Sequence, residues 1–222
     1  MKKLLIEALI KFFGGVIIVA GFLFVPAGTL KWTNGIVFMC LLFIPMFIAG
    51  IIMYIKNPEL LKSRLNAKER QNSQKDVIKY SGIMFIASLV FAGLNYRFGW
   101  TSFPNVVMTI GIIIFLLSYL LFAEVLRENT YLSRTIEVKE NQKVIDTGLY
   151  GIVRHPMYFA TLFLFLSMPL ILNSPISFII MLFYIPLIVV RIINEEKFLE
   201  NKLEGYIEYK KKIKYRLIPF IW

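Results

Sequence analysis

The chain has 222 residues, of which 58% are hydrophobic and 15% aromatic, and its mean hydropathy is +0.68. The apolar residues are concentrated in long runs, which excludes an ordinary soluble domain and indicates a polytopic membrane protein. The formal charge is +11, but the basic residues stand mostly at the ends of apolar runs. Membrane topology and anionic lipids account for that placement, so we expect no nucleic-acid partner. A single cysteine, Cys40, excludes a disulfide framework.

Four apolar runs come first, at about residues 6–25, 35–55, 80–96 and 106–126. Each is near the ~20 residues that a membrane helix needs, so residues 1–126 are predicted to form a four-helix membrane region. The polar segment Lys56–Lys79 between the second and third runs is strongly basic, whereas the outer turns hold one basic residue each, Lys31 and Arg97. Because basic loops stay in the cytoplasm, this asymmetry predicts that both termini are cytoplasmic.

Residues 127–222 are predicted to carry the function. A second polar segment, 127–154, precedes two apolar runs at 157–172 and 176–190, each only ~24 Å long as a helix. A tilted or partly buried hairpin is therefore possible, which gives five to six membrane segments in all. After Arg191 the sequence predicts an amphipathic helix, either lying on the lipid surface or covering a site. The predicted fold is an all-α, polytopic integral-membrane protein, expected in a bacterial or archaeal cell membrane.

The stretch from Asp146 to Tyr158 holds the only histidine, His155, and Pro156 after it can open a helix. A second polar cluster, Arg191 to Glu196, follows the hairpin and would return to the same face of the membrane. Two polar clusters brought together by a membrane hairpin predict a site on the cytoplasmic side.

These residues together resemble a known family. Gly148-Leu-Tyr150, Val153-Arg-His-Pro-Met-Tyr158, Arg191, Glu195-Glu196, Tyr206-Ile-Glu-Tyr209 and Tyr215-Arg-Leu-Ile-Pro219 are similar to the isoprenylcysteine carboxyl methyltransferases. The related phospholipid N-methyltransferases share the Gly-x-Tyr, Arg-His-Pro and Glu-Glu elements. The resemblance implies an integral-membrane methyltransferase that uses S-adenosylmethionine without a Rossmann domain. In agreement, no Gly-x-Gly-x-x-Gly motif follows a predicted strand.

The resemblance also implies roles for particular residues, and we predict no metal site. The cofactor pocket would be formed by Gln142, Val144, Ile145, Tyr150, His155, Pro156, Met157, Tyr158, Glu195 and Glu196. Arg191, whose planar guanidinium suits a carboxylate or phosphate, would face the acceptor's head group. Arg191 and His155 are the catalytic candidates. A carboxylate acceptor is already ionised at neutral pH, whereas an amine would need His155 or a glutamate as base.

Several alternatives stay open. The methyl acceptor is predicted to be a lipid-like or prenylated carboxylate that enters from the bilayer, and a phospholipid amine is the alternative. An NADPH-dependent membrane reductase on a related scaffold and a non-catalytic membrane protein are further possibilities. Each residue also has a purely structural interpretation. His155 could simply start a helix, Arg154 could anchor to lipid phosphate, and Glu195 could pair with Arg191. Membrane lipids are the expected surroundings, and the oligomeric state is left open.

Overall fold

The computed structural model describes residues 2–66, 72–132 and 135–222. All its regular elements are helical, in the order α1 (Lys2–Ala27), α2 (Thr33–Lys56), α3 (Pro58–Leu65), α4 (Asn72–Phe98), α5 (Asn105–Glu128), the 3-10 turn η1 (Gly148–Gly151), α6 (Pro156–Ile171), α7 (Pro175–Leu182), α8 (Tyr184–Lys202) and α9 (Tyr206–Lys212). Within the described residues, five segments are long and apolar enough to cross a membrane, with α6 as a shorter apolar helix. This confirms the predicted all-α polytopic membrane fold with five to six membrane segments.

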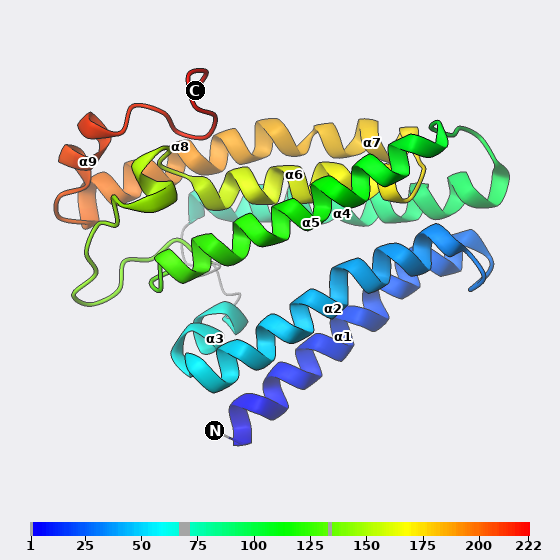
Figure 1. Ribbon diagram of the computed structural model, residues 1–222, viewed down its shortest axis with the longest axis horizontal. Helices are drawn as coiled ribbons and strands as arrows, with labels where there is room; N and C mark the ends of the chain where they lie inside the picture. Colours follow the sequence, from blue (N-terminus) through cyan, green and yellow to red (C-terminus); the bar gives the residue numbers. More distant parts are fainter. Residues whose placement is uncertain (1, 67–71, 133–134) are drawn as a thin grey trace.

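The short helix α6 lies inside the bundle, in contact with α2, α5, α7 and α8 (Figure 1). Half of its sixteen residues are buried, including Tyr158, Ala160 and Leu162. By contrast, the buried residues of α1 are Leu23 and Ala27, and α1 exposes apolar side chains such as Ile10 and Ile17 along its length. Such an apolar outer surface suits contact with lipid. Because α6 is surrounded by protein, its modest length is compatible with a place in the bundle core.

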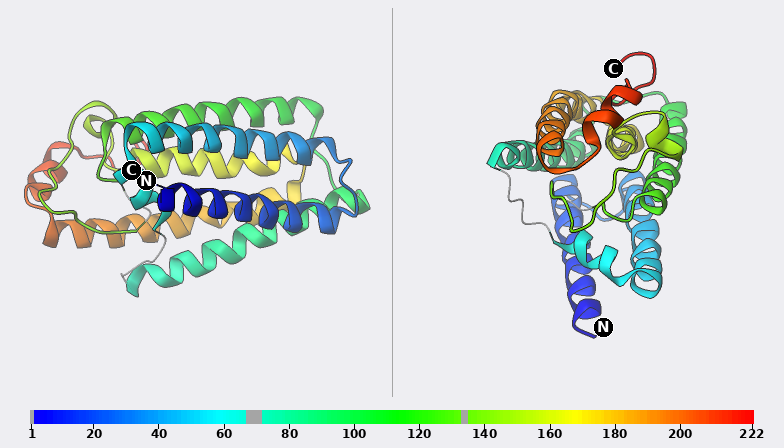
Figure 2. Two further views of the ribbon diagram at one scale, coloured as in Figure 1. Left: turned by 90° about the horizontal axis from the view of Figure 1, so that it is seen from below. Right: turned by 90° about the vertical axis from the view of Figure 1, so that its left-hand side faces the viewer.

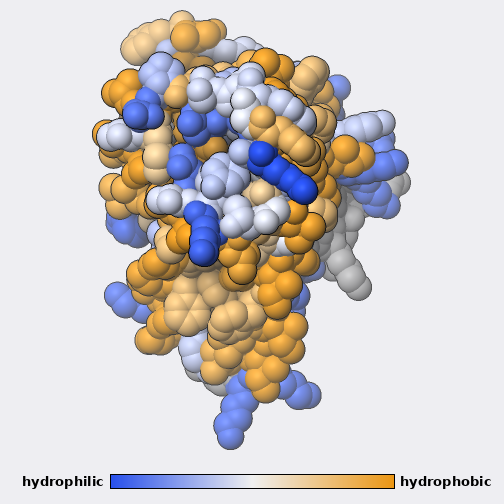
Figure 3. Space-filling model, turned by 90° about the vertical axis from the view of Figure 1, so that its right-hand side faces the viewer, coloured by the Kyte–Doolittle hydropathy of each residue, from blue (hydrophilic) through white to orange (hydrophobic). Residues whose placement is uncertain are grey.

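Both termini, α3, η1 and α9 lie at the same end of the bundle (Figures 1 and 2). The opposite end carries the short turns and shows a small polar cap bordered by apolar side chains (Figure 3). The two long polar segments therefore share one end with the termini, as their order in the sequence requires. That this end faces the cytoplasm stays a prediction.

The polar segment Lys56–Lys79 is more helical than the loop that we predicted. Asn57 caps α3, its side-chain oxygen accepting the N–H of Leu60 at 3.1 Å, and Pro58 takes the first helical position. Helix α4 then begins at Asn72. Residues 67–71 of this segment lie outside the described residues, as do 133–134 of the second polar segment.

The last part of the chain is interrupted twice. Helices α7 and α8 meet at Phe183, where Pro186 provides no N–H and would crowd the carbonyl of Leu182. The single amphipathic helix predicted after Arg191 is wrong, because α8 ends at Lys202 and α9 begins at Tyr206. Gly205 between them has φ of +81°, a left-handed conformation that favours glycine. After this turn α9 lies against η1, where the hydroxyl of Tyr209 donates to the carbonyl of Tyr150.

Candidate active site

A pocket lies at the polar end of the bundle, where the segment after α5, the start of α6, the end of α8 and α9 meet. Most residues predicted to contact a cofactor line it, namely Gln142, Val144, Ile145, Tyr150, His155, Met157, Tyr158 and Glu195. They come from three segments separated in sequence by up to 53 positions, from 142 to 195. The fold therefore brings the two predicted polar clusters to one cavity.

Three predicted residues lie beside this pocket and do not belong to its described lining. Pro156 is buried at the first position of α6, as its missing N–H predicts. Glu196 points into a cluster of basic side chains, and Arg191 reaches the site through the hydroxyl of Tyr158. Their predicted contacts with cofactor or acceptor stay predictions.

The turn that carries Tyr150 is fixed by the end of α5. The N–H of Leu149 donates to both carboxylate oxygens of Glu128, at 3.3 and 3.0 Å. Gly148 has φ of +50°, and a Cβ at that position would lie 1.4 Å from Glu128 Oε1. A side chain cannot be accommodated there without moving Glu128 or the turn. Glycine is thus favoured at this position by its conformation, and any side chain there would have to displace the Glu128 carboxylate.

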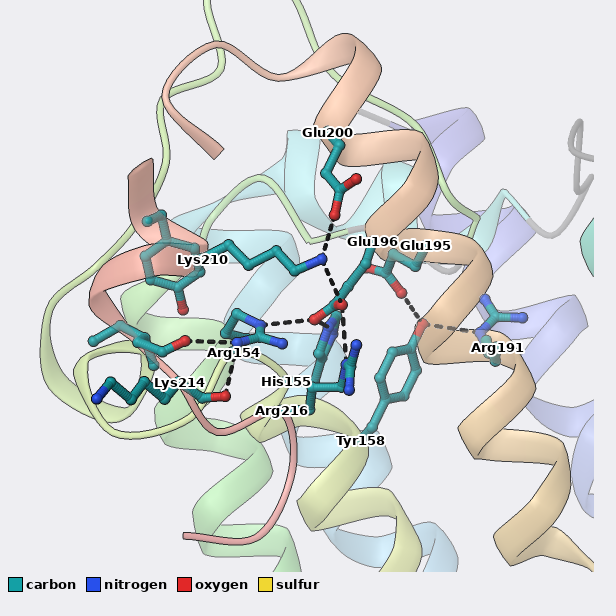
Figure 4. Close-up of polar contacts among 12 residues, drawn as sticks. Arg154, His155, Tyr158, Arg191, Glu195, Glu196, Glu200, Lys210, Lys214 and Arg216 are labelled. Atoms are coloured by element: carbon teal, nitrogen blue, oxygen red, sulfur yellow. Dashed lines mark hydrogen bonds and ion pairs between the residues drawn. The ribbon is translucent and has the colours of Figure 1, made fainter. Parts of the chain in front are cut away.

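Glu196 is 2% exposed and is the centre of an ionic cluster (Figure 4). Its Oε1 accepts from Arg154 Nε at 2.7 Å and lies 3.4 Å from His155 Nε2. Its Oε2 accepts from Arg216 Nε at 3.0 Å and lies 3.5 Å from Lys210 Nζ. A buried carboxylate with this many donors is satisfied by the protein itself. The cluster joins the residues just before α6 to α8, α9 and the C-terminal segment.

Arg154 also holds the C-terminal segment by its other atoms. Its Nη1 donates to the carbonyls of Ile213 at 2.6 Å and Lys214 at 3.0 Å, and its N–H donates to the carbonyl of Tyr215 at 2.9 Å. The guanidinium side chain is only 4% exposed. The interpretation of Arg154 as an anchor to lipid phosphate is therefore wrong, because the side chain is inside the protein.

Glu195, the neighbour of Glu196, faces the pocket instead. The Tyr158 hydroxyl donates to Glu195 Oε2 and accepts from Arg191 Nε at 2.9 Å (Figure 4). The guanidinium of Arg191 also lies over the Tyr158 ring, 5.8 Å from its centroid. The sequence leaves open a direct salt bridge between Arg191 and Glu195. In the structure, the Tyr158 hydroxyl connects the two side chains instead. Tyr158 thus links Glu195, which lines the pocket, to Arg191 beside it.

Two tyrosines outside the membrane helices fix the other side of the pocket. The hydroxyl of Tyr150 accepts from Asn129 Nδ2 at 3.1 Å, and the carbonyl of Tyr150 accepts from the hydroxyl of Tyr209 at 2.8 Å. Burial raises the pKa of Tyr150 and of Tyr209 well above that of a free tyrosine. Both hydroxyls therefore stay protonated and available for these hydrogen bonds.

Sequence reasoning missed part of the lining. These residues come from the segment after α5, from the position before His155, and from the region of α8 and α9. They are Asn129, Tyr131, Leu132, Thr135, Ile136, Glu137, Arg154, Leu199, Leu203, Tyr206 and Tyr209. The spacing of Tyr206 and Tyr209, three positions apart on one helical face, was a usable signal. The segment after α5 gave no such signal, because it has no regular secondary structure.

The fold and the site define a polytopic helical membrane protein with a polar pocket at one end of its bundle. Residues 106–204, a little under half of the chain, match the sequence model of the phospholipid methyltransferase family. The match runs from α5 to the end of α8 and contains every predicted site residue. It agrees with the broader resemblance drawn from the sequence and supports a membrane methyltransferase. The narrower resemblance, to isoprenylcysteine carboxyl methyltransferases, stays a prediction.

The chain is also similar to two curated reductases. It is 28% identical over 93 residues to a Delta(14)-sterol reductase of Methylotuvimicrobium alcaliphilum. It is 30% identical over 91 residues to a Delta(14)-sterol reductase of Mus musculus. Each alignment covers 40% of this chain and 22% of the reductase. The chain thus matches about a fifth of the length of these relatives, and their activity serves here only as an alternative to be tested.

Proposed function

We propose that the protein is an S-adenosylmethionine-dependent methyltransferase of the membrane, acting on a lipid-like acceptor. The observation that carries this proposal is the convergence on one pocket, beside Arg191, of Glu195 with residues 142–145 and with Tyr150, Arg154, His155, Met157 and Tyr158. The match of residues 106–204 to the phospholipid methyltransferase family supports the same class of reaction. In this proposal residues 127–222 carry the site, and residues 1–126 supply membrane helices that support it.

The chemistry of the pocket fits an S-adenosyl cofactor. Val144, Ile145 and Met157 offer apolar surface for a nucleoside, while Glu195 and Gln142 offer polar atoms. A glutamate can accept hydrogen bonds from ribose hydroxyls or from the cofactor's amino group. When bound, the cofactor supplies a methyl group on a sulfonium for in-line attack. The residues named here then have to align the reactants and exclude water.

We propose that Arg191 holds an anionic group of the acceptor next to the pocket. An amine acceptor would need one of two candidate bases, each of which has one partner in the described part of the structure. His155 Nε2 lies 3.4 Å from Glu196 Oε1, and Glu195 accepts from Tyr158. An ionised carboxylate attacks without losing a proton, so it needs no base. The family match favours a second candidate, a phospholipid amine, whose phosphate could occupy the same place beside Arg191.

Transfer of a radioactive methyl group to lipid tests the proposed function. Membranes that contain the protein are incubated with S-adenosylmethionine tritiated on its methyl group, and radioactivity is then counted in the lipid extract. We expect labelled lipid from the wild-type protein and background label from Glu195→Ala at equal protein level. Alkaline treatment should release the label as methanol if a carboxylate is the acceptor, whereas an N-methyl group would resist it. Lipid label no higher than in membranes without the protein would contradict the proposal.

A further inference from the structure

Tyr206, the first residue of α9, has a hydroxyl without a partner among the residues that the structure describes. The residue is only 4% exposed and lines the pocket. A buried hydroxyl that leaves its hydrogen bonds unmade is costly, so most of them are paired in native proteins. This hydroxyl therefore needs an explanation.

The position of Tyr206 is set by the contacts of its neighbours. Tyr209, one turn later on α9, donates to the carbonyl of Tyr150 at 2.8 Å. The rings of Tyr206 and Tyr209 lie with their centroids 5.7 Å apart. Tyr206, Tyr209, Leu203 and Ile213 form one small apolar cluster against Val144. Because these contacts fix α9, packing alone holds the Tyr206 ring at the pocket. Its hydroxyl makes no hydrogen bond with the residues that the structure describes.

The electrostatics around Tyr206 indicate what the hydroxyl can bind. Burial, followed by the nearby carboxylates of Glu196 and Glu195, raises the pKa of Tyr206 far above its usual value. The phenol therefore stays protonated and is a hydrogen-bond donor. Arg154 acts in the opposite direction, so charges of both signs surround the hydroxyl. An uncharged oxygen or nitrogen acceptor suits the position best, because it adds no further buried charge.

We propose that Tyr206 is a ligand-binding residue whose hydroxyl donates to an uncharged acceptor atom of the cofactor's nucleoside. The assignment rests on the proposed function for the identity of the ligand. It gives α9 a direct part in binding, with Tyr209 fixing the helix to η1 and Tyr206 contacting the bound molecule. Helix α9 is thus part of the site, although it lies beyond the residues that match the methyltransferase family.

The test compares Tyr206→Phe with two matched variants in detergent. Binding is measured by titration with S-adenosylhomocysteine and with 5′-methylthioadenosine, which lacks the amino-acid part. We expect Tyr206→Phe to weaken both ligands by a similar factor, roughly 3- to 10-fold, as for the loss of one hydrogen bond. Tyr184→Phe, whose hydroxyl contacts Thr161 in the core at 3.4 Å, should leave both affinities unchanged.

Thermal unfolding without ligand separates binding from folding. Tyr206→Phe should unfold at the same temperature as wild type or higher, because it removes a hydroxyl that has no partner. Tyr209→Phe should unfold at a lower temperature, because it leaves the carbonyl of Tyr150 unpaired. Unchanged affinity of Tyr206→Phe for S-adenosylhomocysteine would overturn the assignment while leaving the proposed function intact. Weaker binding of S-adenosylhomocysteine alone would overturn the nucleoside contact, and no binding by wild type would overturn both proposals.

Discussion

Replacing Glu196 by alanine is expected to destabilise the folded protein by about 3–5 kcal/mol. The substitution leaves the guanidinium of Arg154, 4% exposed, without the carboxylate that it contacts at 2.7 Å. It also removes the contacts of that carboxylate with His155 and Arg216. An unpaired buried charge costs far more free energy than an ion pair contributes. Most of the expected loss therefore comes from leaving the Arg154 guanidinium buried without a carboxylate. The C-terminal segment that Arg154 and Arg216 hold should detach first.

Unfolding temperature in detergent, followed by size-exclusion chromatography, measures this effect. Two glutamates serve as controls. Glu195→Ala removes the neighbouring carboxylate, which faces the pocket, and should leave the protein folded. Glu124→Ala breaks an exposed pair with Arg127 and should change the unfolding temperature little. A Glu196→Ala protein as stable as Glu124→Ala would show that the ionic cluster does not hold the site together.

Replacing Arg191 by alanine is expected to lower methyl transfer by roughly 30-fold to several thousand-fold, with little change in cofactor affinity. The expected loss is that of a charge-assisted contact to an anionic acceptor, worth about 2–5 kcal/mol. Arg191 reaches the pocket through Tyr158, whereas Glu195 lines it directly. The two residues should therefore separate acceptor from cofactor. Turnover and S-adenosylhomocysteine binding have to be measured on the same preparations.

Arg191→Lys provides the graded control. Lysine keeps the charge but lacks the planar fork and the Nε that donates to Tyr158 at 2.9 Å, so only part of the activity should return. Tyr158→Phe tests the same connection from the other side and should lower activity without removing either charge. If Arg191→Ala loses cofactor binding as severely as Glu195→Ala does, the acceptor role is wrong. Arg191 would then act by positioning Tyr158 and Glu195.

The membrane helices were predictable because their signal is local. About 20 apolar residues in a row define a membrane helix whatever surrounds them, so the runs from 6–25 to 106–126 correspond to α1, α2, α4 and α5. The breaks near Phe183 and Gly205 were harder to predict. A proline allows a helix to kink or end, and tertiary packing decides between the two outcomes. Gly205 stands within an amphipathic pattern that continues on both sides of it.

The site was predictable where motif residues point into one pocket, as Tyr150, His155 and Tyr158 do. Sequence could not show which of Glu195 and Glu196 faces the pocket. Adjacent residues on a helix point about 100° apart, and only the surrounding helices decide which direction leads to the pocket. Glu196 meets Arg216, which comes 20 positions later, and Glu195 meets Tyr158, 37 positions earlier. Contacts of this kind depend on the fold as a whole and leave no periodic signal.

The central claim, that this pocket holds an S-adenosyl cofactor, is tested most directly by equilibrium binding to the purified protein. S-adenosylhomocysteine and NADPH are titrated in parallel into wild type and Glu195→Ala, each first shown to be folded by its unfolding temperature. We predict that wild type binds S-adenosylhomocysteine and not NADPH, and that Glu195→Ala weakens this binding at least tenfold, as expected for a hydrogen bond to a charged group. Binding of NADPH without S-adenosylhomocysteine would contradict the account and favour the reductase alternative.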